Sequence, residues 1–431
     1  MDTQKIDPDA HASKTLLFVT NAESGQANTI LALALEALTR PHVEVHIASF
    51  PVLKQRVEKL SPKLNFHALD GKGMLETMAS NAQGWTEANL SHPPTRKSFA
   101  AYGPFLGLVL AVWDGEGTFR SLSGCGWYLM SPPFDPAYMR IYDSIVKVIQ
   151  KLNPGLVVVD NLFNAGVDAC HSLNRKFVLN TPNCVLDVVR DQQPWLKGFW
   201  CYPMFVFASN PIPKLQLSFT SLIRPGTGLS FPIPWRDIPT NIMASIMFIY
   251  RVTMSPDVSE LVKHRNAHGL SGWLPTNAPY TRKLHIICPC VRELDFPLVV
   301  PDNVGLYGSI VLDTSPIEVA DPEMNRWLDG GETVVMCMGT HFRYTESQVK
   351  AVINGFLGAV GHDSNTQFLW KLFNKAKFEH LIEGILQHQK NRERFMIVDW
   401  LKADPISIMR HPNAIVYIHH GGANSYFEAA L

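Results

Sequence analysis

Short apolar runs alternate with segments of helical periodicity in this chain of 431 residues, and that alternation limits the folds it can adopt. Residues 15–20 (TLLFVT) are an apolar run followed by a polar loop at 21–28. Apolar residues then recur at helical spacing until a second strand-like run at 43–50 (VEVHIASF). A strand, a loop, a helix and another strand in this order predict the opening of a parallel α/β sheet.

The same alternation returns further along the chain. Asp135-Pro136 is a good N-cap and first-turn pair for a helix, and the apolar run 156–160 (LVVVD) places Asp160 at the carboxyl end of a strand. Later features are strand-like runs at 333–339, 367–372, 394–400 and 414–420, and a helix-opening capping box from Thr345 to Gln348. We therefore expect an α/β fold with two Rossmann-like parallel-sheet domains, residues 1–303 and 304–431, that face a cleft. Ligands of such sheets bind beyond the carboxyl ends of the strands.

Charge balance and cysteine usage exclude several classes of function. The 38 Lys and Arg residues match 38 Asp and Glu residues, so no net field attracts nucleic acid and no nucleic-acid partner is predicted. Seven cysteines, with Cys288 and Cys290 as the closest pair, have neither zinc-site spacing nor the even number of a disulfide framework. The polar N-terminus is not a signal peptide, and no run reaches the ~20 apolar residues of a membrane span. A cytoplasmic protein is predicted.

The segment 185–280 has a different composition, rich in proline and aromatic residues, with an apolar helical stretch at 241–250. Two interpretations stay open: loops and helices that cover a core, or an aromatic wall around a lipophilic ligand. Peripheral membrane contact is a third and weaker alternative, because the segment has no basic face.

The segment 400–431 concentrates polar residues at a predicted strand-to-helix turn. The strand-like run AIVYI is followed by His419, His420, Gly421, Gly422, Asn424, Ser425 and Glu428. A glycine pair at such a turn lets backbone amides approach an anion in front of a helix dipole, and Asn and Ser side chains can donate to a diphosphate. The glutamate, four residues after the asparagine, shares its helical face and can accept from a ribose hydroxyl. Trp400 offers a flat face on which a base can stack.

This segment resembles the first part of the signature box of the family 1 UDP-dependent glycosyltransferases, particularly fungal ones, which have the two-domain GT-B fold. By residue match, the resemblance assigns the base to Trp400, the diphosphate to His420, Gly421, Gly422, Asn424 and Ser425, and the ribose to Glu428. Gly339 and Thr340 resemble the family's other phosphate-contacting loop. The resemblance implies a UDP-sugar as co-substrate, no permanently bound cofactor and no metal site.

The loop after the first strand departs from the family pattern. The family's general base is a histidine in this loop, and residues 21–28 contain no histidine. Ser24 and Gln26 flank Gly25 instead, and neither is basic enough to take an alcohol proton unaided.

Two further departures concern a carboxylate and the second domain. Asp160 matches the aspartate that orients the family's histidine, so Asp160 or Glu23 is left to take a proton, most easily from an acidic acceptor. The family's box continues beyond the position of Leu431, so the second domain is expected to be incomplete, and the identity of the sugar is not predicted.

The resemblance implies inverting transfer from a UDP-sugar to a lipophilic small molecule, with a fungal secondary metabolite (a terpenoid or polyketide) as the expected acceptor. Residues 1–303 would bind the acceptor and residues 304–431 the UDP-sugar. The alternative is a catalytically inactive relative that binds only nucleotide or acceptor, which the missing histidine favours. A nicotinamide dehydrogenase is excluded because no GxGxxG follows the first strand. The single Asp-x-Asp motif, residues 7–9, lies in the polar N-terminal tail and supports no metal-binding acidic pair.

Overall fold

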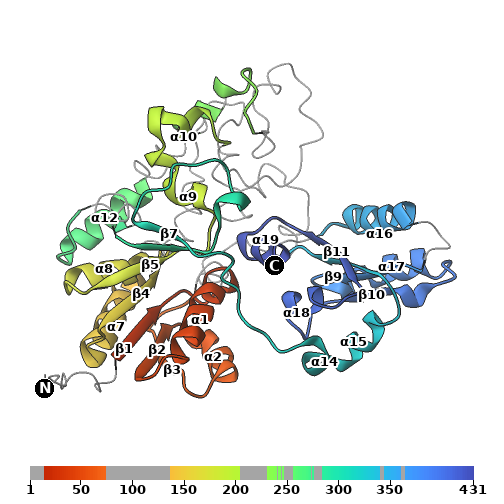
Figure 1. Ribbon diagram of the computed structural model, residues 1–431, viewed down its shortest axis with the longest axis horizontal. Helices are drawn as coiled ribbons and strands as arrows, with labels where there is room; N and C mark the ends of the chain where they lie inside the picture. Colours follow the sequence, from red (N-terminus) through yellow and green to blue (C-terminus); the bar gives the residue numbers. More distant parts are fainter. Residues whose placement is uncertain are drawn as a thin grey trace, which may run out of the picture. The chain divides into compact units, whose positions relative to one another are not determined.

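The computed structural model describes residues 14–73, 136–203, 231–239, 241–243, 245–246, 256–272, 274–275, 284–339, 344–360 and 365–431. The described chain divides into two units, the first ending at Ile310 and the second spanning Val311–Leu431. Each unit has a parallel sheet with helices packed on it (Figure 1). The α/β fold with two parallel-sheet units, expected from the sequence, is confirmed.

The first unit is built on a seven-stranded sheet with the order β3-β2-β1-β4-β5-β6-β7. Its strands are β1 (Lys14–Val19), β2 (Val43–Ser49), β3 (Asn65–Ala68), β4 (Leu156–Asp160), β5 (Phe177–Asn180), β6 (Ile286–Cys288) and β7 (Val304–Leu306). Every neighbouring pair is parallel. The strand order reverses between β1 and β4, and ligands of open α/β sheets bind outside the carboxyl ends of the strands at such a switch point.

Helices of the first unit follow the expected periodicity. They are α1 (Ser24–Leu38), α2 (Lys54–Leu60), α7 (Pro136–Leu152), α8 (Asn164–Ser172), α9 (Val185–Val189), α10 (Lys197–Trp200) and α12 (Pro256–Ala267). In α7 the predicted apolar face is buried, since Ile141, Ile145 and Ile149 have no exposed surface. The apolar stretch predicted at 241–250 is helical at the residues the structure describes, 241–243 and 245–246, and the rest lies outside them.

One prediction for the first unit is wrong: residues 21–28 are not all loop, because α1 begins at Ser24. The carbonyl of Glu23 accepts from the amides of Gln26 and Ala27 at 3.0 and 2.8 Å, so the helix starts directly after Glu23. The start of the helix could not be predicted from apolar spacing, because the polar side chains of its first turn face away from the core.

A buried ion pair connects α12 to α8. Arg265 donates from Nε and Nη2 to the two carboxylate oxygens of Asp168 on α8, at 2.7 and 2.6 Å. Tyr138 of α7 donates its hydroxyl to the same carboxylate at 2.5 Å, and Arg265 also donates to the carbonyl of Gly272. Three helices therefore meet at a single carboxylate, and Arg265 links them to the loop at Gly272.

The second unit has a four-stranded parallel sheet with the order β10-β9-β8-β11. Its strands are β8 (Thr333–Cys337), β9 (Gln367–Lys371), β10 (Phe395–Val398) and β11 (Ala414–His419). Its helices are α14 (Ile317–Ala320), α15 (Pro322–Leu328), α16 (Glu346–Val360), α17 (Glu379–Leu386), α18 (Pro405–Met409) and α19 (Ala423–Ala429). The capping box is confirmed, because the Thr345 amide donates to Gln348 Oε1 and the Gln348 amide to Thr345 Oγ1.

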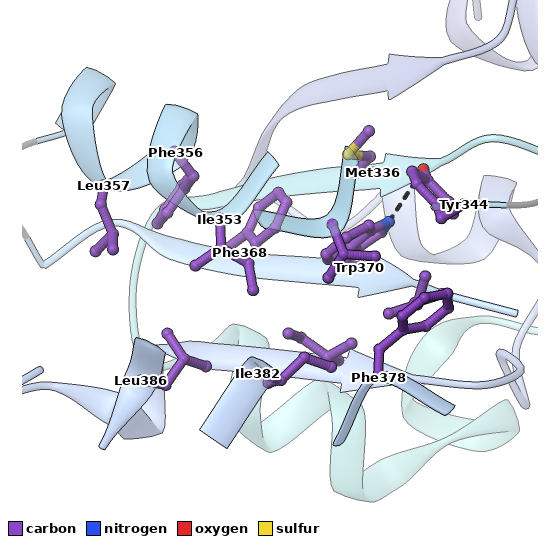
Figure 2. Close-up of a cluster of buried hydrophobic side chains, with 13 residues drawn as sticks. Met336, Tyr344, Ile353, Phe356, Leu357, Phe368, Trp370, Phe378, Ile382 and Leu386 are labelled. Carbon is purple, nitrogen blue, oxygen red and sulfur yellow. Dashed lines mark hydrogen bonds between the residues drawn. The ribbon is translucent and has the colours of Figure 1, made fainter. Parts of the chain in front are cut away.

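Apolar side chains cover both faces of this sheet. On one face, residues of α16 and α17 pack on alternate residues of the central strands, and Trp370 donates its indole N–H to the Tyr344 hydroxyl at 3.2 Å (Figure 2). On the other face, α14, α15 and α18 pack around Leu369. Successive residues of β9 therefore point to opposite cores, as a strand buried on both faces requires.

The boundary between the units lies after the position that the sequence suggested. Residues 304–306 form β7, which pairs with β6 of the first sheet, so the division falls between Ile310 and Val311. A three-residue strand is too short to show a periodic pattern, and its partner is needed to identify it. Among the described helices, none is long and apolar enough to cross a membrane.

Candidate functional site

Two loops meet at the carboxyl edge of the second sheet, where β8 and β11 are neighbours. The last paired residues of these strands are Cys337 and His419. Gly339 follows β8 and Gly421 follows β11, with φ angles of 76° and 75°. This left-handed conformation favours glycine over any residue with a Cβ atom, so the backbone itself explains both glycines.

The imidazole of His420 lies against glycines of both loops. A Cβ atom on Gly339 would come within 2.8 Å of His420 Cε1, and a Cβ atom on Gly422 within 2.4 Å of His420 Nε2. Ordinary van der Waals contact begins at 3.4 Å, so the absence of a side chain at each position makes room for the ring. The structure thus brings together Gly339, His420 and Gly422, three of the seven residues that the sequence assigned to phosphate contacts. Thr340, another of the seven, lies outside the described residues.

One glycine amide in the turn between β11 and α19 makes a hydrogen bond within the turn. Gly421 donates its amide to His419 Nδ1 at 3.2 Å, and burial lowers the pKa of His419, which favours this neutral acceptor. Gly422 is the N-cap residue of α19, and no side chain caps the helix. The first amides of a helix have no intrahelical partner and carry partial positive charge. An anion at this turn would therefore meet the amides of α19 rather than the amide of Gly421.

Helix α19 carries Asn424, Ser425 and Glu428, as expected. Ser425 and Glu428 both lie close to the hydroxyl of Tyr417 on β11. Burial is the main cause of the raised pKa of Tyr417, and the charge of Glu428 adds to it. Tyr417 in turn stacks on His419 with ring centroids 5.1 Å apart. Two polar residues of α19 therefore lie beside the Tyr417 hydroxyl on the neighbouring strand.

Trp400 lies in the loop after β10, which ends at Val398, and not at the end of the strand as predicted. Its side chain is 58% exposed, an unusual state for so large an apolar ring. The ammonium of Lys371, the last residue of β9, lies 3.7 Å from the centroid of the indole ring. A cation over a tryptophan face at this distance is a cation–π contact.

The candidate carboxylate of the first unit lies at the switch point. Asp160 ends β4, is 1% exposed, and accepts from the Leu162 amide at 2.9 Å and the Thr20 hydroxyl at 3.5 Å. Burial raises the pKa of Asp160 to about 7; the Leu162 and Asn21 amides oppose the shift, and the charge of Glu23 adds to it. The carboxyl group therefore titrates near neutral pH.

The other candidate residues of this region surround the start of α1. Glu23 is buried, Gln26 is half-buried and Ser24 is exposed, with Arg56 donating to its hydroxyl at 3.4 Å. A Cβ atom on Gly25 would meet no atom within 4 Å, so there is open space beside the helix start. The structure places Glu23 close enough to Asp160 to affect its pKa, which the sequence did not indicate.

Several residues at these edges were not singled out from the sequence. They are Thr20 in the first unit, and Lys371 and Tyr417 in the second. A usable signal existed for two of them: Lys371 is a charged residue at the end of an otherwise apolar strand, and Thr20 ends the first apolar run. Among the described residues, no group of three or more His, Cys, Asp or Glu side chains could hold a metal ion.

Solved structures with the same fold are glycosyltransferases. The glycotransferase of kitacinnamycin aligns over 96% of this chain and 77% of its own length, with a TM-score of 0.54 and 10% identity. Medicago truncatula UGT71G1, complexed with UDP-glucose, aligns over 98% of this chain and 78% of its own, with a TM-score of 0.52 and 13% identity. These likenesses show the GT-B fold.

Sequence comparison is more specific. No protein-family model matches the chain. Glycosyltransferase sdnJ of Sordaria araneosa is 30% identical over 440 residues, which covers 97% of this chain and 78% of that protein. The chain therefore belongs to the family 1 UDP-glycosyltransferases. The family suggested by the C-terminal segment is confirmed, and the roles of individual residues stay predictions.

Proposed function

We propose that this glycosyltransferase transfers a sugar from a UDP-sugar to a lipophilic small molecule, with inversion at the anomeric carbon. The observation that carries this proposal is the position of the His420 ring, which lies against Gly339 and Gly422 at the carboxyl edge of the second sheet. It joins the two loops that the family resemblance assigned to one diphosphate. We assign the donor to the second unit and the acceptor to the first.

The second unit has the chemistry that the departing nucleotide needs. Transfer builds positive charge on the sugar ring and negative charge on the diphosphate as the glycosidic oxygen leaves. The start of α19, with the Asn424 and Ser425 side chains, offers fixed donors to that negative charge. Glu428 on the same helix would accept from a ribose hydroxyl, and the exposed ring of Trp400 would stack on uracil.

We assign Asp160 of the first unit as the general base that removes the acceptor proton. Its pKa of about 7 suits a general base near neutral pH. Its 1% exposure limits direct contact with a large acceptor, so Asp160 would act through a smaller group such as a water molecule or the Ser24 hydroxyl. An acceptor carboxylate is already ionised and needs no base, so acidic acceptors should react faster than alcohols.

Exposed aromatic rings support a lipophilic acceptor. In the segment 185–280 the side chains of Trp195 and Trp235 are 85% and 74% exposed. Contiguous exposed apolar patches mark surfaces for apolar ligands, or for a membrane surface as the weaker alternative, and we propose that these two rings contribute to such a patch. A fungal secondary metabolite stays our proposal for the acceptor, supported by the match to a Sordaria araneosa glycosyltransferase.

Calorimetry with UDP, ADP and NAD tests the donor assignment. We expect UDP to bind most tightly, and Trp400→Ala to weaken it by roughly 1–3 kcal/mol, the range for loss of a base–aromatic stack. Trp235→Ala, which removes an exposed tryptophan of the first unit, is the matched control and should leave UDP binding unchanged. Equal affinity for all three nucleotides, or no effect of Trp400→Ala, contradicts the donor site.

Rates on one alcohol and one carboxylic acid acceptor test the chemistry. Ser24→His or Gln26→His should raise activity on the alcohol alone, because an imidazole oriented by Asp160 would supply a base that can take the alcohol proton directly. The anomeric configuration of the product, read by NMR coupling constants, tests inversion. UDP binding without transfer to any acceptor would favour the alternative of a catalytically inactive relative.

A further inference from the structure

We propose that Lys371 is a positioning residue of the donor site: its ammonium holds the Trp400 indole so that one face alone is open to the nucleotide base. The proposal rests on the proposed function, because it takes Trp400 as the base-stacking residue. It concerns a contact between β9 and the loop after β10 that the residue patterns did not suggest.

The strand geometry explains why a lysine reaches this ring. In β9, Leu369 packs in the core formed with α14, α15 and α18, and Lys371 lies two residues later on the same face. Lys371 pairs with Val398, the last residue of β10, and Trp400 follows two residues after that. The ammonium and the indole therefore lie together at the carboxyl end of one sheet face, 3.7 Å apart.

Burial makes this contact strong. Lys371 is 8% exposed, so its ammonium is largely removed from water. A cation–π contact is stronger when the cation is desolvated than when it is exposed to water, and tryptophan is the best partner ring. Trp400 is 58% exposed, so packing covers less than half of its surface, and the contact with Lys371 restrains the orientation of the ring.

The consequence for a ligand is preorganisation. With the cation on one face of the indole, a base can stack only on the opposite face, in one orientation. Immobilising a side chain on binding costs about 0.5–1.5 kcal/mol, which corresponds to about a two- to tenfold loss of affinity if the ring must be ordered by the ligand. Lys371 removes that cost before the nucleotide arrives.

Calorimetric titration of the full chain with UDP and with uridine tests the proposal. Lys371→Met keeps the apolar stem and removes the charge, and we expect both ligands to bind about two- to tenfold more weakly. Lys371→Arg keeps a cation that can stack on the ring and should restore both affinities. Lys375→Met is the control, because this more exposed lysine faces Glu379 at 3.7 Å; its affinities should equal those of the wild type.

The comparison of the two ligands distinguishes positioning from direct contact. A loss confined to UDP would mean that Lys371 meets the diphosphate, and would overturn the proposal. In the Trp400→Ala background, Lys371→Met should have no further effect on uridine, and an equal effect in both backgrounds would also overturn it. Thermal unfolding of each variant shows whether the fold is retained, and Lys371→Gln replaces Lys371→Met if that variant is unstable.

Failure of this inference is separable from failure of the proposed function. If the wild type binds UDP and Trp400→Ala weakens binding while Lys371→Met does not, the donor site stands and Lys371 has no positioning role. If the wild type binds neither ligand, the donor assignment fails and this inference fails with it.

Discussion

Three glycines around His420 can be used to separate backbone strain from steric contact. Gly421 has a φ of 75°, and a Cβ atom there would meet no atom within 4 Å, so Gly421→Ala introduces strain alone. Gly422 has a φ of −62°, which any residue adopts, but its Cβ atom would lie 2.4 Å from His420 Nε2. Gly339 combines a φ of 76° with a contact of 2.8 Å to the same ring.

The expected magnitudes follow from these geometries. A left-handed alanine costs roughly 1–2 kcal/mol, which is the expected loss for Gly421→Ala. The His420 side chain is exposed and can rotate aside, so the steric contact in Gly422→Ala should cost about 1 kcal/mol, the low end of the range for overpacking, and should displace the imidazole. Gly339→Ala carries both effects and should lose about 2–3 kcal/mol, the largest of the three.

Hydrogen exchange read by mass spectrometry measures the local free energy of opening of β8 and β11, and calorimetry gives the UDP affinity of each variant. We expect UDP binding to fall most in Gly339→Ala and Gly422→Ala, because both move the His420 ring. Truncating the ring with His420→Ala removes the steric contact. In that background Gly422→Ala should become neutral, or stabilising by about 0.4–1 kcal/mol, because alanine restricts the unfolded chain.

Persistence of the full Gly422→Ala loss in the His420→Ala background would refute the reasoning. It would show that the cost arises in the backbone of the turn and not from the ring. Equal losses of UDP affinity in Gly421→Ala and Gly339→Ala would likewise contradict a specific role for the position of the imidazole.

Three further predictions concern the rest of the molecule. Arg265→Ala leaves the Asp168 carboxylate buried without its cation and should destabilise the first unit by about 3–5 kcal/mol in urea unfolding, whereas Arg40→Ala, at an exposed pair, should cost less than about 1 kcal/mol. Burial lowers the pKa of His46 and of His67, whose rings share a 2.9 Å hydrogen bond, so the unfolded chain binds more protons and stability falls as pH drops below about 6.5. A double variant with glutamine at both histidines should show a smaller loss of Tm on acidification, and an unchanged pH dependence would contradict this. Transfer activity should survive EDTA, and loss of activity that manganese restores would disprove leaving-group stabilisation by α19 alone.

Local sequence patterns determined most elements of this protein. The run LVVVD corresponds to β4, the capping box opens α16, and the C-terminal segment folds as strand, turn and helix. These features depend on residues a few positions apart, whose spacing along a strand or helix is constant. The residues of the proposed donor site could be selected from sequence for the same reason, since the turn after β11 carries most of them within one short segment.

Tertiary structure alone decided which distant residues meet and what their environment does to them. Asp168 and Arg265 are 97 positions apart, and no local pattern pairs them. The contact of Lys371 with Trp400 depends on the register of β9 against β10. The position of the His420 ring depends on Gly339, a glycine in another loop. Asp160 was recognised as a strand-end carboxylate from its sequence, but its pKa of about 7 arises from burial and from the charge of Glu23. Desolvation and charge act through space, so they follow from packing and not from the order of residues along the chain.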